Sequence, residues 1–250
     1  MKCYGLIGYP LTHSFSARFF SEKFAREAII GCSYRNFPIE HIGLLPKLIS
    51  ENEYLVGLNV TIPYKEQVIP YLFHIDAESA AIGAVNTIKI IRKKGKVDLL
   101  GFNTDAYGFG ASLRPFLTKH FSRALILGTG GASKAAEHVL SGLGIDVTFV
   151  SRRPRGMNHL SYDQVTADVI GSNQIIINTS PIGMYPDINS FPVLPYEFLT
   201  PDHVLFDMVY NPPETRFMAM GKKMGASVIN GLQMLHLQAE KAWEIWNSDL

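Results

Sequence analysis

The sequence predicts an α/β fold in two domains, the second a doubly wound domain with a parallel sheet. Strand-like and helix-like segments alternate along most of the 250 residues, a pattern typical of layered α/β architectures. Short apolar segments such as 124–127 recur in the second half, as expected of parallel strands buried on both faces. We place the first domain at residues 1–103, with a terminal helix at 231–250 packing back on it, and the second domain at 104–230.

In the first domain, apolar segments bounded by turn residues predict strands. We expect strands at 4–8, 34–38 and 55–60. Residues 16–29 have helical spacing and place Phe19, Phe20 and Phe24 on one face. Two further strand-like segments, 86–91 and 97–102, flank a basic tip that contains glycine, and this predicts a hairpin.

The second domain alternates in the same way. It opens with a helix at 104–116, and a strand, a glycine-rich turn and a helix at 133–143 follow. The next strand covers 146–150. Later apolar strands are expected at 174–178 and 203–207, and the last helix at 231–246.

Composition and charge exclude several classes of protein. The chain is 47% hydrophobic and 18% charged, with a formal net charge of +1. Binding to nucleic acid or to an anionic membrane needs a concentrated basic field, and the chain has none. The two cysteines cannot build a disulfide framework or a Cys-x-x-Cys metal site. No apolar segment approaches the about 20 residues of a membrane helix, and the N-terminal segment reads as a strand, not a signal sequence. We therefore expect a cytoplasmic protein without a metal.

The glycine-rich turn predicts a dinucleotide site. It follows a buried strand, precedes a helix and consists of Gly128, Thr129, Gly130, Gly131 and Ala132. A helix N-terminus offers unpaired N–H groups to a pyrophosphate, and glycines let the phosphate approach. The match to G-x-G-x-x-G is partial, because Ser133 replaces the third glycine. Structural turns use glycine too, but the flanking strands and helix favour dinucleotide binding.

The end of the next strand indicates which dinucleotide binds. An acid about 20 residues beyond the loop would hold the ribose 2′-OH of NAD. Here Ser151, Arg152 and Arg153 stand in that place, and Ser151 lies 23 residues after Gly128. Two guanidinium groups suit a 2′-phosphate, so the sequence predicts NADP. A solvated basic loop is the alternative interpretation.

Polar residues follow several predicted strands of the first domain. Ser14 and Ser16 stand after the first strand at a helix start, where capping is an equally good explanation. The segment from Asn59 through Thr61 to Lys65 follows a buried strand. Open α/β sheets bind ligands at the carboxyl ends of such strands. Two further turns, at 83–87 and 101–105, add the amide of Asn86 and the carboxylate of Asp105.

Eight motifs in order give the chain its resemblance to a known family. They are HSFS, NVTIPYK, GAVNT, GFNTD, GTGGAS, Ser-Arg-Arg after the second strand of the glycine-loop domain, DMVYNP and NGLQML followed by a glutamine. Each is weak alone, but together they cover the chain from Tyr4 to about Trp246, and in this order the chain resembles the shikimate dehydrogenases. The resemblance implies a substrate domain facing a Rossmann-like NADP domain across a cleft.

The resemblance also implies roles for single residues. Lys65 and Asp105 match the catalytic pair. The matches to ligands of the substrate hydroxyls and carboxylate are Ser14, Ser16, Thr61, Asn86, Tyr210 and Gln238, with Asn59 as a weaker neighbour. The cofactor positions are Gly128, Thr129, Gly130, Gly131, Ala132, Ser151, Arg152 and Arg153, with Met208 and Gly231 beside the nicotinamide.

Three positions depart from the family pattern. Ala17 replaces the proline after the second serine of the first motif, and Phe102 replaces an aspartate. Both changes spare the reacting groups. The usual Asn-Arg-Thr reads Ser151-Arg152-Arg153, which keeps the preference for NADP but leaves the contact with the adenine side open.

The resulting expectation is reduction of 3-dehydroshikimate to shikimate with NADPH, in aromatic amino-acid and chorismate biosynthesis. Lys65 would exchange a proton with the substrate oxygen, with Asp105 as its partner. The expected partner is the small-molecule substrate, and the chain is expected to be a monomer or a homodimer. Two alternatives remain: a quinate/shikimate dehydrogenase of broader substrate and cofactor range, and a catalytically silent NADP-binding sensor.

Overall fold

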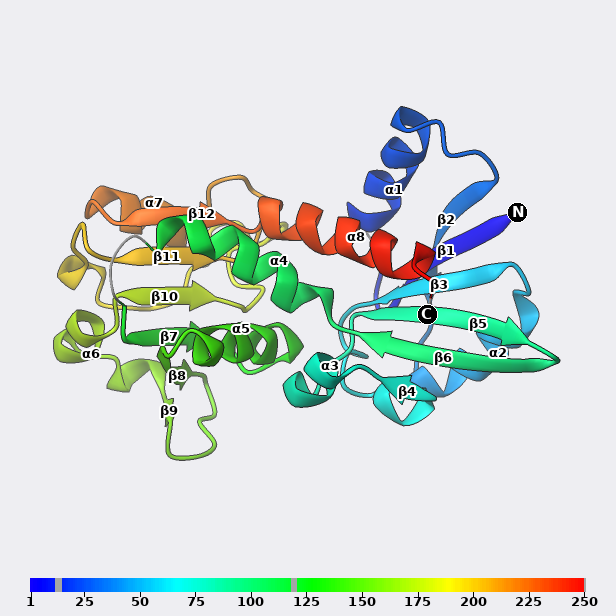
Figure 1. Cartoon of the computed structure of the whole chain (residues 1–250). Coiled ribbons are helices and arrows are strands. Elements are labelled where there is room, and N and C mark those ends of the chain that lie inside the picture. Colours follow the sequence, from blue (N-terminus) through cyan, green and yellow to red (C-terminus); the bar gives the residue numbers. More distant parts are fainter. Residues whose placement is uncertain (12–14, 118–120, 250) are drawn as a thin grey trace. The chain divides into compact units, whose positions relative to one another are not determined.

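The computed structural model describes residues 1–11, 15–117 and 121–249. The chain divides into two compact units, residues 1–104 with 238–250, and residues 105–237. The boundaries expected from sequence were 103 and 230, whereas the division lies at 104 and 237, so residues 231–237 belong to unit 2. The chain passes from unit 1 to unit 2 within one helix, α4 (Thr104–Leu113), and returns within another, α8 (Leu232–Asn247). Each unit has its own six-stranded sheet (Figure 1).

Unit 1 contains a mixed sheet with the strand order β2-β1-β3-β5-β6-β4. Its strands are β1 (Lys2–Gly8), β2 (Cys32–Pro38), β3 (Leu55–Val60), β4 (His74–Ile75), β5 (Thr87–Lys93) and β6 (Lys96–Phe102). Its helical segments are α1 (Phe15–Arg26), η1 (Ile42–Leu44), α2 (Leu45–Glu51), η2 (Ile69–Tyr71), α3 (Ala77–Ile82) and the end of α8. The predicted hairpin is confirmed, because β5 and β6 pair antiparallel up to Lys93 and Lys96, on either side of the basic tip.

The two faces of this sheet bury different side chains. One face packs aliphatic residues such as Ile7, Leu58 and Ile88 against α2. On the other face, α1 and α8 contribute Phe20 and Trp246 to an aromatic cluster. The predicted helix with one phenylalanine face is thus confirmed as α1.

The end of α8 is fixed to the middle of the sheet by polar contacts. The indole Nε1 of Trp246 donates to the carbonyl oxygen of Ile88 at 3.0 Å. A Cβ on Gly57 would lie 2.5 Å from that Nε1, so glycine is needed where the indole meets β3. The buried Lys89 ammonium donates to the carbonyl oxygens of Ile245 (3.0 Å) and Ser248, and so caps the helix.

Unit 2 is a parallel sheet with the order β12-β11-β10-β7-β8-β9. Its strands are β7 (Arg123–Leu127), β8 (Asp146–Val150), β9 (His159–Leu160), β10 (Ile175–Asn178), β11 (Val204–Asp207) and β12 (Ser227–Asn230). Besides α4 and the start of α8, its helical segments are η3 (Arg114–Phe116), α5 (Gly131–Gly142), η4 (Tyr162–Gln164), α6 (Ala167–Ser172), η5 (Tyr196–Phe198) and α7 (Arg216–Lys223). The strand order reverses direction at β7 and β10, which confirms the doubly wound prediction.

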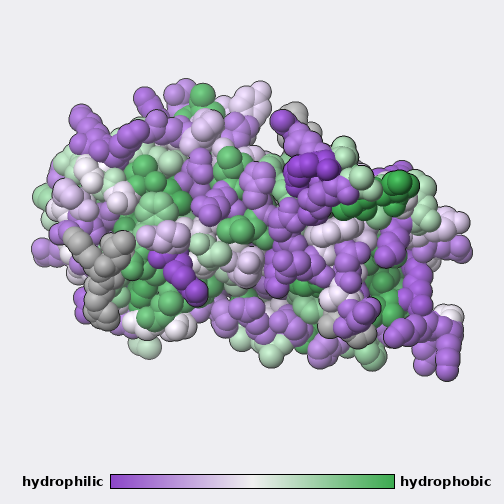
Figure 2. Space-filling view, turned by 45° about the horizontal axis from the view of Figure 1, so that its top comes forward, coloured by the Kyte–Doolittle hydropathy of each residue, from purple (hydrophilic) through white to green (hydrophobic). Residues whose placement is uncertain are grey.

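Alternate residues of these strands enter two cores, one on each face of the sheet. Ala124 and Ile126 belong to the core that α4 and α5 cover, whereas Leu125 and Leu127 belong to the other. This explains why the strand reads as an unbroken apolar segment. Hydrophilic residues cover most of the face drawn in Figure 2. Among the described residues, no helix is long and apolar enough to cross a membrane.

Candidate active site

Several of the polar residues predicted in the first domain lie at one edge of the unit 1 sheet, where its carboxyl-terminal strand ends meet. Strands β1 and β3 are parallel, and β6 runs in their direction because both β3 and β6 pair antiparallel with β5. The carboxyl ends of β1, β3 and β6 therefore meet the start of β5. Asn59, Asn86 and Asn103 mark this edge, and all three are buried.

A chain of hydrogen bonds joins four of the predicted residues there. The Tyr34 hydroxyl donates to Asn59 Oδ1 at 2.7 Å and is also hydrogen-bonded to Ser16. Asn59 Nδ2 donates to Thr87 Oγ1 at 3.4 Å, and Thr87 Oγ1 donates to Asn86 Oδ1 at 3.1 Å. From Asn86, further hydrogen bonds connect to Thr104 and then to Gln238.

Asn86 is the centre of this polar chain. Its Oδ1 accepts from the backbone N–H of Thr104 at 2.7 Å, and its Nδ2 donates to Thr104 Oγ1 at 3.0 Å. Thr104 Oγ1 in turn donates to Gln238 Oε1 at 3.4 Å. The amide thereby holds the start of α4, and Asp105 is the next residue of that helix. We call the set Ser16, Tyr34, Asn59, Thr87, Asn86, Thr104 and Gln238 the polar chain.

Lys65 and Thr61 lie in the turn that follows β3. The backbone N–H of Thr61 donates to the carbonyl oxygen of Ile7 at 2.9 Å, which fixes the turn to β1. The carbonyl oxygen of Lys65 accepts from Val85 N at 2.7 Å, so the turn is also fixed to the segment before Asn86. Both side chains are partly exposed. Lys65 belongs to unit 1, and Asp105 is the first residue of unit 2. Ser14 lies outside the described residues.

Tyr34, Thr87 and Thr104 were missed by sequence reasoning. Burial raises the pKa of Tyr34 far above its usual value, so the phenol stays protonated and can donate to Asn59. A tyrosine in a strand reads as an apolar core residue, and nothing in the sequence pattern marks its hydroxyl. The threonines carried a signal, because Asn-Thr occurs twice at strand–turn junctions, at 86–87 and 103–104.

The glycine turn of unit 2 lies at the point where the strand order reverses. Gly128 N donates to the carbonyl oxygen of Val150 at 2.9 Å, and Thr179 N donates to that of Leu127 at 3.0 Å. Gly128 has φ +122°, and a Cβ there would lie 2.6 Å from Thr179 Oγ1. A Cβ on Gly130 would point into open space, and Gly130 precedes α5 as its N-cap. This cradle fits a pyrophosphate.

The end of β8 also fits a ligand with additional acceptor oxygens. Ser151 Oγ is shielded from solvent and has no hydrogen-bond partner among the described residues. An unpaired buried hydroxyl costs roughly 1–3 kcal/mol, which an acceptor oxygen of a ligand would offset. Arg152 and Arg153 follow and are exposed. The residues present therefore fit the 2′-phosphate of NADP.

Met208, Tyr210 and Gly231 follow the neighbouring strands β11 and β12 in unit 2. A Cβ on Gly231 would overlap the carbonyl group of Met208, so the two segments are in close contact. Gly231 N donates to the carbonyl oxygen of Val209 at 3.2 Å. The structure thus brings together the two residues predicted beside the nicotinamide.

A buried carboxylate next to them was not predicted as part of the site. Asp207 ends β11 and is fully buried. Burial raises its pKa to about 6, although hydrogen bonds from Thr215, Val209 and Asn178 lower it. Its signal in the sequence was the aspartate of DMVYNP, which read as the end of a strand.

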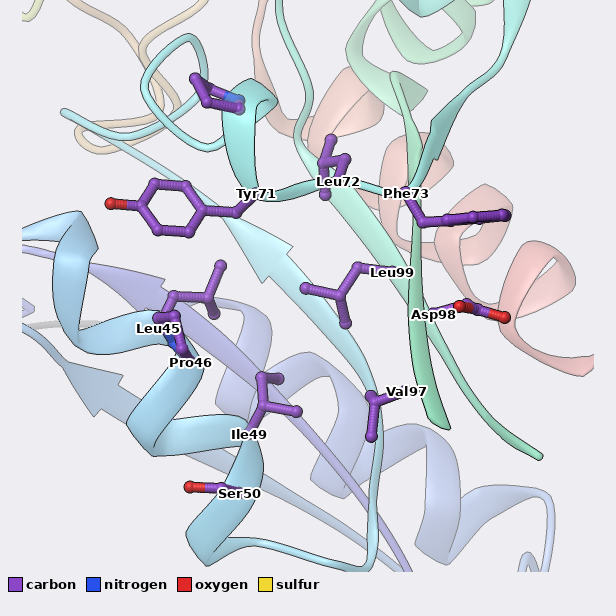
Figure 3. A pocket seen from close by; sticks show the side chains of 11 residues that line it. Leu45, Pro46, Ile49, Ser50, Tyr71, Leu72, Phe73, Val97, Asp98 and Leu99 are labelled. Carbon is purple, nitrogen blue, oxygen red and sulfur yellow. The ribbon is translucent and has the colours of Figure 1, made fainter. Parts of the chain in front are cut away.

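A separate cavity of about 400 Å³ lies in unit 1 between α2, β6 and the segment 70–73 (Figure 3). Leu45, Ile49 and Leu99 are among the apolar side chains that line it, and Asp98 adds a carboxylate. The described residues of the predicted site do not line this cavity. No group of three or more metal-ligating side chains occurs within the described ranges.

Comparison with known proteins agrees with this geometry. Residues 6–88 match the family described as "Shikimate dehydrogenase substrate binding domain". The shikimate dehydrogenase (NADP(+)) of Clostridium beijerinckii is 40% identical over 98% of this chain and 92% of its own length. The chain belongs to the shikimate dehydrogenase family.

Solved structures of this family have the same fold. A shikimate dehydrogenase in complex with NADP+ superposes with a TM-score of 0.85 at 32% identity, covering 99% of this chain and 90% of that one. The Thermus thermophilus enzyme, in complex with NADP(H) and shikimate, gives a TM-score of 0.84 at 29% identity, covering 100% of this chain and 95% of that one. The predicted two-domain fold is confirmed.

Proposed function

We propose that this chain is an NADP-dependent shikimate dehydrogenase that reversibly reduces 3-dehydroshikimate to shikimate in the biosynthesis of chorismate and the aromatic amino acids. The polar chain carries this proposal, because it gathers hydroxyl and amide groups at the same sheet edge as the Lys65 turn. Such groups suit a small molecule with several hydroxyls and a carboxylate. Membership of the family and the phosphate cradle of unit 2 support it.

The substrate ligands in this proposal are Ser14, Ser16, Asn59, Thr61, Asn86, Tyr210 and Gln238. The buried amide of Asn86 has a fixed orientation, because both its oxygen and its nitrogen are hydrogen-bonded within the protein. Donors and acceptors that are already fixed recognise a pattern of hydroxyl groups without losing side-chain conformational entropy on binding. From Asn86, the hydrogen bonds continue on one side through Thr104 to Gln238 and on the other side through Thr87 to Asn59.

Lys65 is proposed to donate the proton that the ketone oxygen needs, and to remove it in the reverse direction. Bound NADPH supplies the hydride. Negative charge builds on the oxygen during reduction, so a positioned proton donor lowers the barrier. Asp105 is proposed as the partner of Lys65 in this transfer. It is the second residue of α4, and the first, Thr104, is hydrogen-bonded to Asn86.

The cofactor is proposed to lie on unit 2. The turn Gly128–Ala132 would hold the pyrophosphate, and Ser151, Arg152 and Arg153 the 2′-phosphate. Met208 and Gly231 would lie beside the nicotinamide. We further propose that the protein acts in the cytoplasm as a monomer or a homodimer.

The test is oxidation of NADPH with 3-dehydroshikimate, followed by absorbance, with NADH and with 3-dehydroquinate, the ketone of quinate, in parallel. We expect fast turnover of NADPH with 3-dehydroshikimate and much slower turnover of NADH. Comparable rates with NADH and with the quinate ketone would favour a quinate/shikimate dehydrogenase of broader range. Tight NADPH binding without turnover of either ketone would indicate a sensor and contradict the proposal.

A further inference from the structure

Three hydrogen-bond donors converge on the buried carboxylate of Asp207. Asn178 Nδ2 and the backbone N–H of Val209 both donate to Oδ1, each at 3.0 Å. The hydroxyl of Thr215 donates to Oδ2 at 2.5 Å. Asp207 and Asn178 are fully buried and Thr215 nearly so, so these bonds are shielded from water.

The three donors come from three different segments of unit 2. Asn178 ends β10, Val209 lies in the turn after β11, and Thr215 is the N-cap of α7. The Thr215 hydroxyl also accepts from Met218 N at 3.3 Å. One carboxylate therefore fixes both ends of the connection 208–215 and ties it to the neighbouring strand.

The connection that Asp207 fixes carries the two residues proposed to face the reactants. Met208 and Tyr210 flank Val209, whose N–H is bonded to Asp207 and whose carbonyl oxygen accepts from Gly231 N. Since Gly231 and the Met208 carbonyl are in close contact, the backbone at 208–209 is held from two sides. Asn178 also fixes the turn that follows β10, because its Oδ1 accepts from Ser180 N at 3.1 Å.

We propose that Asp207 is a positioning residue of the dehydrogenase, which holds the turn 208–210 in the shape that presents Met208 to the nicotinamide and Tyr210 to the substrate. The inference rests on the proposed function, because the roles of Met208 and Tyr210 belong to it. Burying this carboxylate costs folding free energy, as its raised pKa indicates. What the carboxylate contributes is a fixed geometry at the carboxyl edge of the sheet, where doubly wound domains bind ligands.

The test compares substitutions of Asp207 and of its donor Thr215 with a control substitution at the amino end of β11. Asp207→Ala and Thr215→Val remove the carboxylate and one of its donors, and Thr215→Ser retains the hydroxyl. The control is His203→Ala, because His203 is buried just before β11, at its amino end, and is also hydrogen-bonded, with Thr200 N donating to its Nδ1 at 3.0 Å. Steady-state kinetics for NADPH and 3-dehydroshikimate are measured together with thermal unfolding.

We expect kcat of Asp207→Ala to fall by about 10²-fold, the loss that a displacement of about 1 Å causes near a reacting centre, with KM raised for both substrates. Thr215→Val should show a smaller change of the same kind, and Thr215→Ser should restore the kinetics. His203→Ala should lower Tm and leave both KM values unchanged, because a loss of folded enzyme lowers the maximal rate alone.

Unchanged kcat and KM in folded Asp207→Ala would overturn the proposal, and so would equal kinetic changes in His203→Ala. If Asp207→Ala does not fold, the Thr215 pair decides, and identical kinetics of its Val and Ser variants would overturn it. If the wild-type chain itself does not turn over, the proposed function fails. Asp207 is then judged by equilibrium binding of NADP+, which we expect to weaken about tenfold in Asp207→Ala; equal binding would refute its role.

Discussion

Individual buried polar side chains determine the chemistry available at both sheet edges. Asn86 in unit 1 and Asp207 in unit 2 each organise several donors around one side chain, and both are at most 3% exposed. Burying such groups is costly unless they are hydrogen-bonded. Each of the two satisfies its neighbours. Asn86 is itself assigned to the substrate, and Asp207 directly precedes Met208, which we assign to the nicotinamide.

The raised pKa of Asp207 predicts a pH-dependent stability term. A carboxyl whose pKa rises from 3.8 to about 6 on folding binds its proton more tightly in the folded chain. Stability from this group is therefore full below about pH 4 and decreases as pH rises to about 6. We expect the free energy of unfolding of Asp207→Asn, relative to wild type, to increase by up to ~3 kcal/mol over this interval. Urea denaturation at several pH values measures it, and a difference that is constant with pH would contradict the shift.

The guanidinium groups after β8 predict the cofactor preference. Replacing Arg152 and Arg153 together by alanine should raise KM for NADPH by about 10²–10⁴-fold, as expected for the loss of charged hydrogen bonds worth about 1.5–3 kcal/mol each, and leave the constants for NADH unchanged. Arg123→Ala, at the amino end of β7, is the control. Parallel NADPH and NADH titrations measure this. An unchanged preference for NADPH would show that these arginines belong to a solvated basic loop and do not bind the 2′-phosphate.

Strands β2, β3 and β5 together carry the first half of the polar chain, so a change in one strand should act on the next. Tyr34→Phe removes the hydroxyl that bonds Asn59 and Ser16, and we expect KM for 3-dehydroshikimate to rise by about fivefold, the effect of roughly 1 kcal/mol. KM for NADPH should not change. Tyr4→Phe is the control, because Tyr4 belongs to the same aromatic cluster and its hydroxyl donates to the side chain of Asn247, outside the polar chain, at 3.4 Å. Equal substrate KM values for Tyr34→Phe and wild type would show that the tyrosine only packs.

Elements with a clear periodicity or an unbroken apolar sequence could be predicted, and short mixed ones could not. Strands β3 and β8 have the predicted bounds, because Leu55–Val60 and Asp146–Val150 are apolar segments between turn residues. The strands β4, β9 and β12 and the helices α2, α3, α6 and α7 were missed. Ser227–Asn230 is a strand only because it pairs with β11 at the edge of the sheet, and tertiary pairing of this kind leaves little trace in so few residues.

At the level of the whole chain, motif order predicted more than local pattern did. Family resemblance gave the two-domain fold, the cofactor and the reaction, since eight weak motifs in sequence are specific together. It gave four members of the polar chain, but not the hydrogen bonds that join them, nor those of Asp207. These depend on strands that are distant in sequence, such as β2 with β3 and β10 with β11, becoming neighbours. Only the folded sheet places Tyr34 beside Asn59.

In the proposed reaction, Lys65 transfers the proton and the cofactor held by unit 2 donates the hydride. The most direct test is the rate of NADPH oxidation with 3-dehydroshikimate by Lys65→Ala, beside wild type and Lys47→Ala, whose side chain is 71% exposed. We predict that kcat of Lys65→Ala is lower by about 10²–10⁴-fold, with NADP+ affinity retained and Lys47→Ala unaffected. A folded Lys65→Ala protein that oxidises NADPH at nearly the wild-type rate would contradict the assignment of Lys65 as the proton donor.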